Sequence, residues 1–231
     1  ELKAKAETEE LTQLSGIGEK TQEKILSSIN RAEQVVGKLN LAEGEIWANS
    51  LREYLLAFDL IDKVELVGQL RRQEELITEL ALLVAGSNQA VIEAQIANLP
   101  VISEVEQVDS KLLRAETELG IDFIFHLSSP AEFAADLFRL TGTEKFKEEL
   151  KADLSQVKTV EEEAEIFKEL GLSYIIPELR DDPASIRAAQ KGSLPESITQ
   201  ADIKGDLHLH STWSDGRVSI QEMAVACQAR E

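Results

Sequence analysis

The sequence contains very few of the residues that cross-link a protein or anchor it to a membrane. Its 231 residues include a single cysteine, Cys227, which excludes a framework of disulfide bonds within the chain and fits a reducing cytoplasm. No apolar run approaches the roughly 18–20 residues needed to cross a bilayer, and no signal-peptide pattern opens the sequence. Hydrophobic residues make up 43% and charged residues 29%, as in a soluble globular protein. We therefore expect a cytoplasmic protein with no membrane contact.

Basic residues are scarce as well. Lys and Arg total 24 against 43 Asp and Glu, and the resulting net charge of -19 is unfavourable for binding nucleic acid, because phosphate repels an acidic surface. The distribution is uneven, since residues 12–40 hold four basic against three acidic residues, whereas residues 58–130 hold five against thirteen. Any contact with DNA is therefore expected near the amino end.

Only three histidines are present, and two of them, His208 and His210, lie in a run of alternating apolar residues. The alternation predicts a short buried strand that carries both imidazoles on one face. Neutral imidazoles suit zinc, manganese or iron, and Asp215 on the following loop could add an oxygen ligand. A strand end with two half-buried histidines is the plain alternative to a metal site. Asp206 and the turn at residues 214–216 favour the metal site.

A second motif, Gly16-Ile17-Gly18, predicts a tight turn between two helices in residues 11–26. Both glycines permit a positive φ, and Ile17 can pack between the helices. The start of the second helix presents unpaired N–H groups, which form a seat for phosphate with two lysines beside it. The motif resembles a helix-hairpin-helix, which binds the DNA backbone without reading sequence, and an ordinary pair of helices is the alternative. The candidate DNA-binding residues are Gly16, Ile17, Gly18, Lys20, Thr21 and Lys24.

The rest of the chain predicts an α+β fold. Residues 30–57 are expected to be helical, with breaks at Gly37 and Gly44. Between residues 64 and 127 the elements follow the order strand, strand, helix and three strands, which favours a mixed or antiparallel sheet with helices on one face. Further helices are expected in residues 131–140, 144–150, 160–170 and 185–190. The solvated face of the third of these would consist of Glu161, Glu162, Glu163, Glu165 and Glu169.

The string from Gly205 to Gly216 resembles the opening motif of the PHP (polymerase and histidinol phosphatase) family. The resemblance implies a metal-dependent phosphoesterase built as a distorted α/β barrel. In it, His208, His210 and Asp215 would ligate metal. Asp206 would be either a further ligand or a residue that orients an imidazole, and we favour the second role. The sequence ends within the helix that follows and has no methionine at residue 1. A barrel needs far more than one strand and one helix, so we expect part of a longer protein that by itself binds no metal tightly.

Five landmarks along the chain together resemble the bacterial family X DNA polymerases that carry a carboxy-terminal PHP domain. They are Gly68–Arg72, Ile77–Val84, Thr141–Gly142, Ile176–Arg180 and Gly205–His210, and the resemblance covers essentially all 231 residues. It implies a helix-hairpin-helix and fingers segment in residues 1–57, a nucleotidyltransferase-like palm with a mixed sheet in 58–129, a small helical thumb in 130–180, a linker in 181–204, and the first strand and helix of a PHP barrel in 205–231.

The palm departs from the family pattern at the residues that would carry its chemistry. Nucleotidyl transfer by two metal ions needs a cluster of carboxylates on adjacent strands. The family's three aspartate positions are occupied here by Glu79, Ala81 and Ile124, and the serine of its first landmark is Gln69. Glu79 and Asp122 could rebuild a single weak metal site, although a solvated pair of acids is the simpler interpretation. We therefore expect a palm without catalytic activity.

These features predict a DNA-repair protein of the family X type whose working centre is the PHP domain. That domain would be a 3′-5′ exonuclease or related phosphodiesterase that uses a divalent metal such as Mn, Zn or Mg. The present chain would supply the DNA-binding part, through backbone contacts that do not depend on sequence. Two alternatives remain open: a non-catalytic DNA-binding or scaffold module, and an active gap-filling polymerase, which the missing aspartates oppose. The sequence leaves the oligomeric state undetermined.

Overall fold

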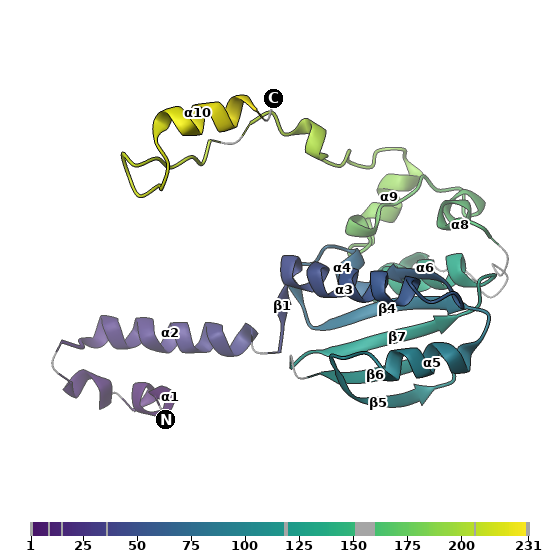
Figure 1. Cartoon of the computed structure of the whole chain (residues 1–231), viewed down its shortest axis with the longest axis horizontal. Coiled ribbons are helices and arrows are strands. Elements are labelled where there is room, and N and C mark those ends of the chain that lie inside the picture. Colours follow the sequence, from purple (N-terminus) through teal and green to yellow (C-terminus); the bar gives the residue numbers. More distant parts are fainter. Residues whose placement is uncertain are drawn as a thin grey trace. The chain divides into compact units, whose positions relative to one another are not determined.

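The computed structural model describes residues 2–8, 10–14, 16–35, 37–117, 120–150, 160–205 and 207–229 (Figure 1). The chain forms two compact units, residues 1–194 and residues 195–231. The larger unit contains the sheet and most of the helices, and each unit is described by itself below.

The amino-terminal residues form a small helical hairpin. Helix α1 (Leu2–Glu7) and a single 3-10 turn, η1 (Glu10–Gln13), precede the long helix α2 (Glu19–Val35). Gly37, with φ of 72°, follows α2 and agrees with the break predicted there. A second break, at Gly44, is a wrong prediction, because this glycine lies inside helix α3 (Leu41–Leu56). A Cβ at Gly44 would come within 3.1–3.2 Å of the Leu70 and Ile77 side chains, so the glycine permits close packing instead.

Five strands form a mixed sheet in the order β2, β4, β7, β6, β5 (Figure 1). Strands β4 and β7 are parallel, and the other neighbours are antiparallel. The sheet agrees with the predicted α+β class. Of the two predicted arrangements, mixed or antiparallel, it has the mixed one. Its strands are β2 (Ile61–Leu66), β4 (Glu79–Gly86), β5 (Ile102–Asp109), β6 (Leu112–Thr117) and β7 (Asp122–Ser128), while β1 (Leu39–Asn40) and β3 (Leu76–Ile77) form a separate short ladder.

Helices cover both faces of the sheet, so the prediction of helices on one face is wrong. Leu80 and Leu82 of β4 share a core with α3 and with helix α5 (Gln89–Ala97). The alternate residues Ala81 and Leu83 pack instead against helix α6 (Phe133–Thr141). The reason is visible in β4 itself, where six consecutive apolar residues are buried, as in a strand with both faces covered.

The chain turns sharply after β2. Strand β2 ends at Leu66, and a one-turn helix, α4 (Gly68–Arg71), follows it. Gly68 has a positive φ of 61°, which permits the change of direction. Beyond the sheet, short helices surround a second core formed by Phe138, Phe146, Ile166, Phe167, Ile175, Ile186 and Ala189. They are α7 (Glu144–Leu150), α8 (Glu163–Glu169), η3 (Pro177–Leu179) and α9 (Ala184–Gln190).

The second unit contains a 3-10 turn, η4 (Gln200–Asp202), and helix α10 (Ile220–Gln228). A reciprocal pair of hydrogen bonds between Ser219 and Glu222 caps the start of α10. The buried strand predicted around His208 does not form, since the described residues of this unit contain no strand and Leu207 is 98% exposed. A strand requires a hydrogen-bonded neighbour, and these residues supply none.

Candidate functional site

A cleft of about 370 Å³ opens between the sheet and the helices that follow it. Its lining residues come from the turn into α4, from strands β4 and β7, and from the connection between α6 and α7. Its polar lining residues are Gln69, Arg72, Glu79, His126, Thr143, Glu144 and Lys147. The family pattern places its motif residues at positions 69, 79, 81 and 124. Three of these, Gln69, Glu79 and Ala81, line the cleft.

The register of β4 and β7 determines how the three expected aspartate positions lie. Glu79 is opposite Asp122, and Ala81 is opposite Ile124. Because side chains two residues apart point to the same face of a strand, Glu79, Ala81 and Ile124 share the face covered by α6. The hydrocarbon side chains of Ala81 and Ile124 offer no metal ligand, which leaves Glu79 as the one carboxylate among the three.

The alternative of a weak metal site at Glu79 and Asp122 loses one of its two carboxylates. Arg114 donates two hydrogen bonds to Oδ2 of Asp122, one of them from Nε at 2.9 Å. A guanidinium bound in this way competes with a metal for the same oxygen. Glu79 has no hydrogen-bond or ion-pair partner among the described residues, but a single carboxylate is a poor divalent-metal site.

The cations of the cleft are paired with carboxylates of the same chain. Arg72 donates from Nη1 to the Thr141 carbonyl at 2.6 Å and from Nη2 to Glu74. Its Nε lies 2.7 Å from Oδ1 of Asp181, as an ion pair without hydrogen-bond geometry. Lys147 forms an ion pair of 2.5 Å with Glu144. The cleft thus holds its positive charges in internal pairs.

His126 lines the cleft from strand β7, two residues before the strand ends at Ser128. Burial lowers the pKa of His126 and outweighs the attraction of Asp109 and Asp136, which acts in the other direction. Burial therefore favours the neutral imidazole of His126.

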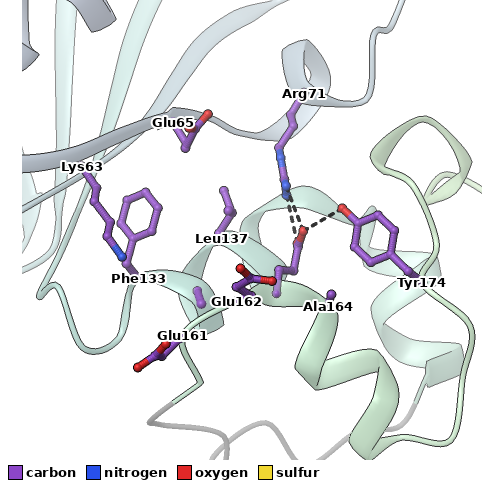
Figure 2. Close-up of a pocket in the computed structure, with 11 residues that line it drawn as sticks. Lys63, Glu65, Arg71, Phe133, Leu137, Glu161, Glu162, Ala164 and Tyr174 are labelled. Carbon is purple, nitrogen blue, oxygen red and sulfur yellow. Dashed lines mark hydrogen bonds and ion pairs between the residues drawn. The ribbon is translucent and has the colours of Figure 1, made fainter. Parts of the chain in front are cut away.

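A buried ion-pair network that the sequence did not predict joins helix α4 to the helices beyond the sheet (Figure 2). Arg71 donates two hydrogen bonds to the Glu163 carboxylate, at 2.9 and 2.8 Å. The Tyr174 hydroxyl also donates to this carboxylate, at 3.3 Å (Figure 2). Arg180 donates two further hydrogen bonds to it. Glu163 is 7% exposed and Arg180 is fully buried, so the placement of Glu163 on a solvated helix face is wrong.

The periodicity of α8 could have identified Glu163. Ile166, Phe167 and Leu170 follow it by three, four and seven residues, which places Glu163 on the apolar stripe of the helix. A carboxylate on such a stripe needs a buried partner, and two of the landmark motifs end in arginine. Burial raises the pKa of Glu163, but the hydrogen bonds from Arg71 and Arg180 outweigh it, so the pKa lies below its ordinary value.

The amino-terminal hairpin has the turn that its sequence predicted, with a shorter first helix. Gly16 has φ of 90°, whereas Gly18 keeps a negative φ and its carbonyl accepts the N–H groups of Thr21 and Gln22 at 2.9 and 3.0 Å. Ile17 is half-buried in the turn. Lys20, Thr21 and Lys24 are exposed in the first turns of α2, where a phosphate could reach them.

The three expected metal ligands in the second unit are only partly brought together. Nδ1 of His210 lies 2.5 Å from Oδ1 of Asp215, and the rings of His208 and His210 are 4.8 Å apart between centroids. The hydrogen bond from His210 lowers the pKa of Asp215. Asp206 lies outside the described residues. Across the described ranges, no three His, Cys, Asp or Glu side chains form a group that could hold a metal ion, although two imidazoles and a carboxylate suit Zn or Mn chemically.

Comparison with known proteins finds a relative of this chain. No protein-family model matches the chain. The chain is 30% identical, over 98% of its length, to the DNA polymerase/3′-5′ exonuclease PolX of Bacillus subtilis strain 168. This chain is similar to part of PolX. It spans 43% of the length of PolX, and the similarity runs through both units. The match supports the family X assignment made from the five landmarks.

None of the helices in the described ranges has the length and apolar composition to cross a membrane.

Proposed function

We propose that this chain is the DNA-binding part of a DNA-repair protein of the family X polymerase type. The observation that carries the proposal is its similarity to PolX along 98% of the chain. In this proposal the helix-hairpin-helix and fingers occupy residues 1–57, the palm 58–129, the thumb 130–180, a linker 181–204 and the start of a PHP domain 205–231.

The palm in this proposal holds DNA or positions other segments but transfers no nucleotide. Two-metal phosphoryl transfer requires carboxylates that bridge both ions. Ala81 and Ile124 cannot ligate a metal, and Asp122 is bound by Arg114. An active gap-filling polymerase is therefore the less favoured alternative.

The amino-terminal hairpin is the proposed site of DNA contact. Its exposed Lys20 and Lys24 lie at the start of α2, where helix N–H groups and lysine charge can bind phosphate together. The acidic remainder of the chain limits the affinity, so binding should be independent of sequence, steeply salt-dependent and no tighter than about 10⁻⁴–10⁻⁶ M.

Fluorescence anisotropy with a labelled gapped duplex tests the DNA-binding proposal. The variant Lys20→Glu, alone and combined with Gly16→Val, should bind more weakly and show a smaller dependence on salt. Lys191→Glu makes the same charge change at an exposed lysine in another part of the chain and is the matched control. Equal binding by all variants would remove the hairpin from the proposed function.

A complete PHP domain would contain the working centre of the parent protein. His208, His210 and Asp215 are the proposed ligands for a divalent ion (Mn, Zn or Mg), with Asp206 as a supporting residue. The ion would supply charge for a phosphoester oxygen and an activated water. The residues of this chain would hold the ion by two imidazole nitrogens and one carboxylate. The name of PolX includes a 3′-5′ exonuclease, which is the activity proposed here.

The test uses the full-length parent protein with His208→Ala combined with His210→Ala. Both the content of bound manganese and the exonuclease activity should fall, while the DNA affinity of the hairpin is retained. A double variant that keeps its metal and its nuclease activity would exclude the ligand assignment. A parent without nuclease activity, but with intact DNA binding, would favour the alternative of a non-catalytic scaffold.

A further inference from the structure

Strand β5 has one edge that no other strand covers. It is the last strand in the order β2, β4, β7, β6, β5, so β6 pairs with one side of it, and within the described ranges no strand pairs with the other side (Figure 1). The register with β6 is regular from Glu104 to Gln107 and shifts before and after this stretch. Backbone N–H and C=O groups on such an edge can bind an extended segment of another chain.

The pairing of β6 with β7 determines which way the backbone of β6 points. The N–H of Leu127 donates to the carbonyl of Lys111, the residue before β6, at 2.7 Å, and the same register pairs Leu113 with Phe125. Because backbone groups alternate in direction along a strand, the odd-numbered residues of β6 face β7. The even-numbered residues, among them Arg114, face β5.

The backbone of β5 alternates in the same way. Glu106 is opposite Arg114 and Glu104 is opposite Glu116, so these two residues of β5 direct their backbone groups toward β6. Val105 and Gln107 therefore direct theirs away from the sheet. Each of the two offers one N–H donor and one carbonyl acceptor to a new strand.

The side chains on one face of this edge are acidic. Glu104 and Glu106 are exposed and lie two residues apart, which places them on the same face. Glu104 is directly opposite Glu116, a pairing of like charges that disfavours the sheet unless a cation lies near it. Arg114 is opposite Glu106, but its guanidinium is bound to Asp122. The edge therefore attracts positive charge.

The opposite face of the edge is apolar. Ile102 and Val105 are partly buried against the core that the sheet shares with α3 and α5. Strand β5 thus has carboxylates on one face and hydrocarbon on the other. A strand in which lysine alternates with apolar residues has the complementary pattern, because its side chains also alternate between the two faces.

We propose that the free edge of β5 binds an extended, lysine-rich segment of a partner protein, which adds a strand to the sheet. The backbone of Val105 and Gln107 supplies the hydrogen bonds, and Glu104 and Glu106 select lysine on one face. A second copy of this chain fits the edge poorly, because pairing β5 with β5 would bring the same carboxylates of both copies together. Nucleic acid is repelled by these carboxylates.

The inference goes beyond the proposed function, because it requires neither the amino-terminal hairpin nor a metal. The hairpin could bind DNA whether or not β5 binds a peptide. The two proposals can therefore fail separately.

Fluorescence anisotropy with a short labelled peptide of alternating lysine and valine tests the edge. Gln107→Pro removes an N–H that points away from the sheet and leaves the pairing with β6 intact. It should weaken binding roughly tenfold, the effect expected for the loss of a backbone hydrogen bond and of close approach. A peptide of alternating lysine and proline has the same charge but cannot pair as a strand, and it should bind wild type far more weakly.

Charge variants test the selection of lysine. Glu104→Gln combined with Glu106→Gln should bind the lysine–valine peptide several-fold more weakly and with a smaller dependence on salt. Glu53→Gln combined with Glu148→Gln makes the same change of charge at exposed residues elsewhere and should behave like wild type. Thermal melts establish that each variant is folded.

Amide hydrogen exchange measured by NMR on wild type tests the site without any substitution. The Val105 and Gln107 amides should exchange rapidly in the free chain and slowly with the peptide bound, whereas the Glu106 amide should be protected in both states. Unchanged exchange at Val105 and Gln107 in the saturated complex would overturn the proposal, and so would equal binding of the two peptides.

Two further results would reassign the edge to another occupant and reject a lysine-rich partner. One is a dimeric wild type that Gln107→Pro converts to a monomer in gel filtration, which would identify a second copy of the chain. The other is a labelled single-stranded oligonucleotide whose binding falls in Gln107→Pro, which would identify nucleic acid.

Discussion

Replacement of Glu163 by alanine removes the one carboxylate that joins Arg71 and Arg180. Arg180 is fully buried, and the Arg71 side chain is 18% exposed. Arg180 lies against the rings of Phe138, Phe167 and Tyr174, so its guanidinium could not regain its lost hydrogen bonds from water without a rearrangement of those rings. Removing one partner of a buried ion pair costs about 3–5 kcal/mol. Because whole domains are stabilised by only about 5–15 kcal/mol, Glu163→Ala should lose a large share of the free energy of unfolding.

Urea unfolding followed by circular dichroism and tryptophan fluorescence measures this loss. Trp47 packs against the sheet core and reports its unfolding. Glu163→Gln keeps the shape and one acceptor oxygen, so it should cost less, about 1.5–3 kcal/mol. Glu169→Ala removes an exposed carboxylate from the same helix and should stay within about 0.5 kcal/mol of wild type. A Glu163→Ala variant as stable as Glu169→Ala would refute the structural role of the network.

Three further predictions follow from the same structure. The stabilisation from Glu163 should be fully present above its ordinary pKa of 4.5, and it should disappear as the pH falls through its lower folded-state pKa. The urea midpoint of wild type should therefore drop more steeply in acid than that of Glu163→Gln. Gly44→Val should destabilise the chain by about 1–3 kcal/mol, because its side chain would overlap neighbours in the core, and an unchanged thermal midpoint would contradict this. The chain should incorporate no nucleotide on a gapped duplex with Mg²⁺ or Mn²⁺, since Ala81 and Ile124 cannot ligate metal. Primer extension by wild type that is abolished in Glu79→Ala would contradict this prediction.

Much of the fold could be predicted because its signals are local. The alternation of apolar residues located the strands, and the helical periodicity located the helices to within a few residues. The strand predicted at residues 205–210 failed for a non-local reason, since a strand depends on a neighbour that the described residues of this unit do not provide. Gly44 was misassigned because its role in packing depends on side chains that follow much later in the sequence.

The candidate sites divide in the same way. The sequence by itself determined that positions 81 and 124 carry no carboxylate, since residue identity alone excludes them as metal ligands. It also located the Gly16–Gly18 turn, because the conformation of a turn depends on the residues within it.

Only the tertiary structure decided which charges neutralise one another. Glu163 lies 92 residues from Arg71 and 17 from Arg180, yet all three meet in one buried network. Asp122 could be counted as a free carboxylate until the pairing of β6 with β7 brought Arg114 beside it. Residue type fixes the charge that a side chain carries. The partner of a charged side chain depends on its distance in space from other groups, and the energy of their interaction depends on burial. Both distance and burial are set only when distant segments pack together.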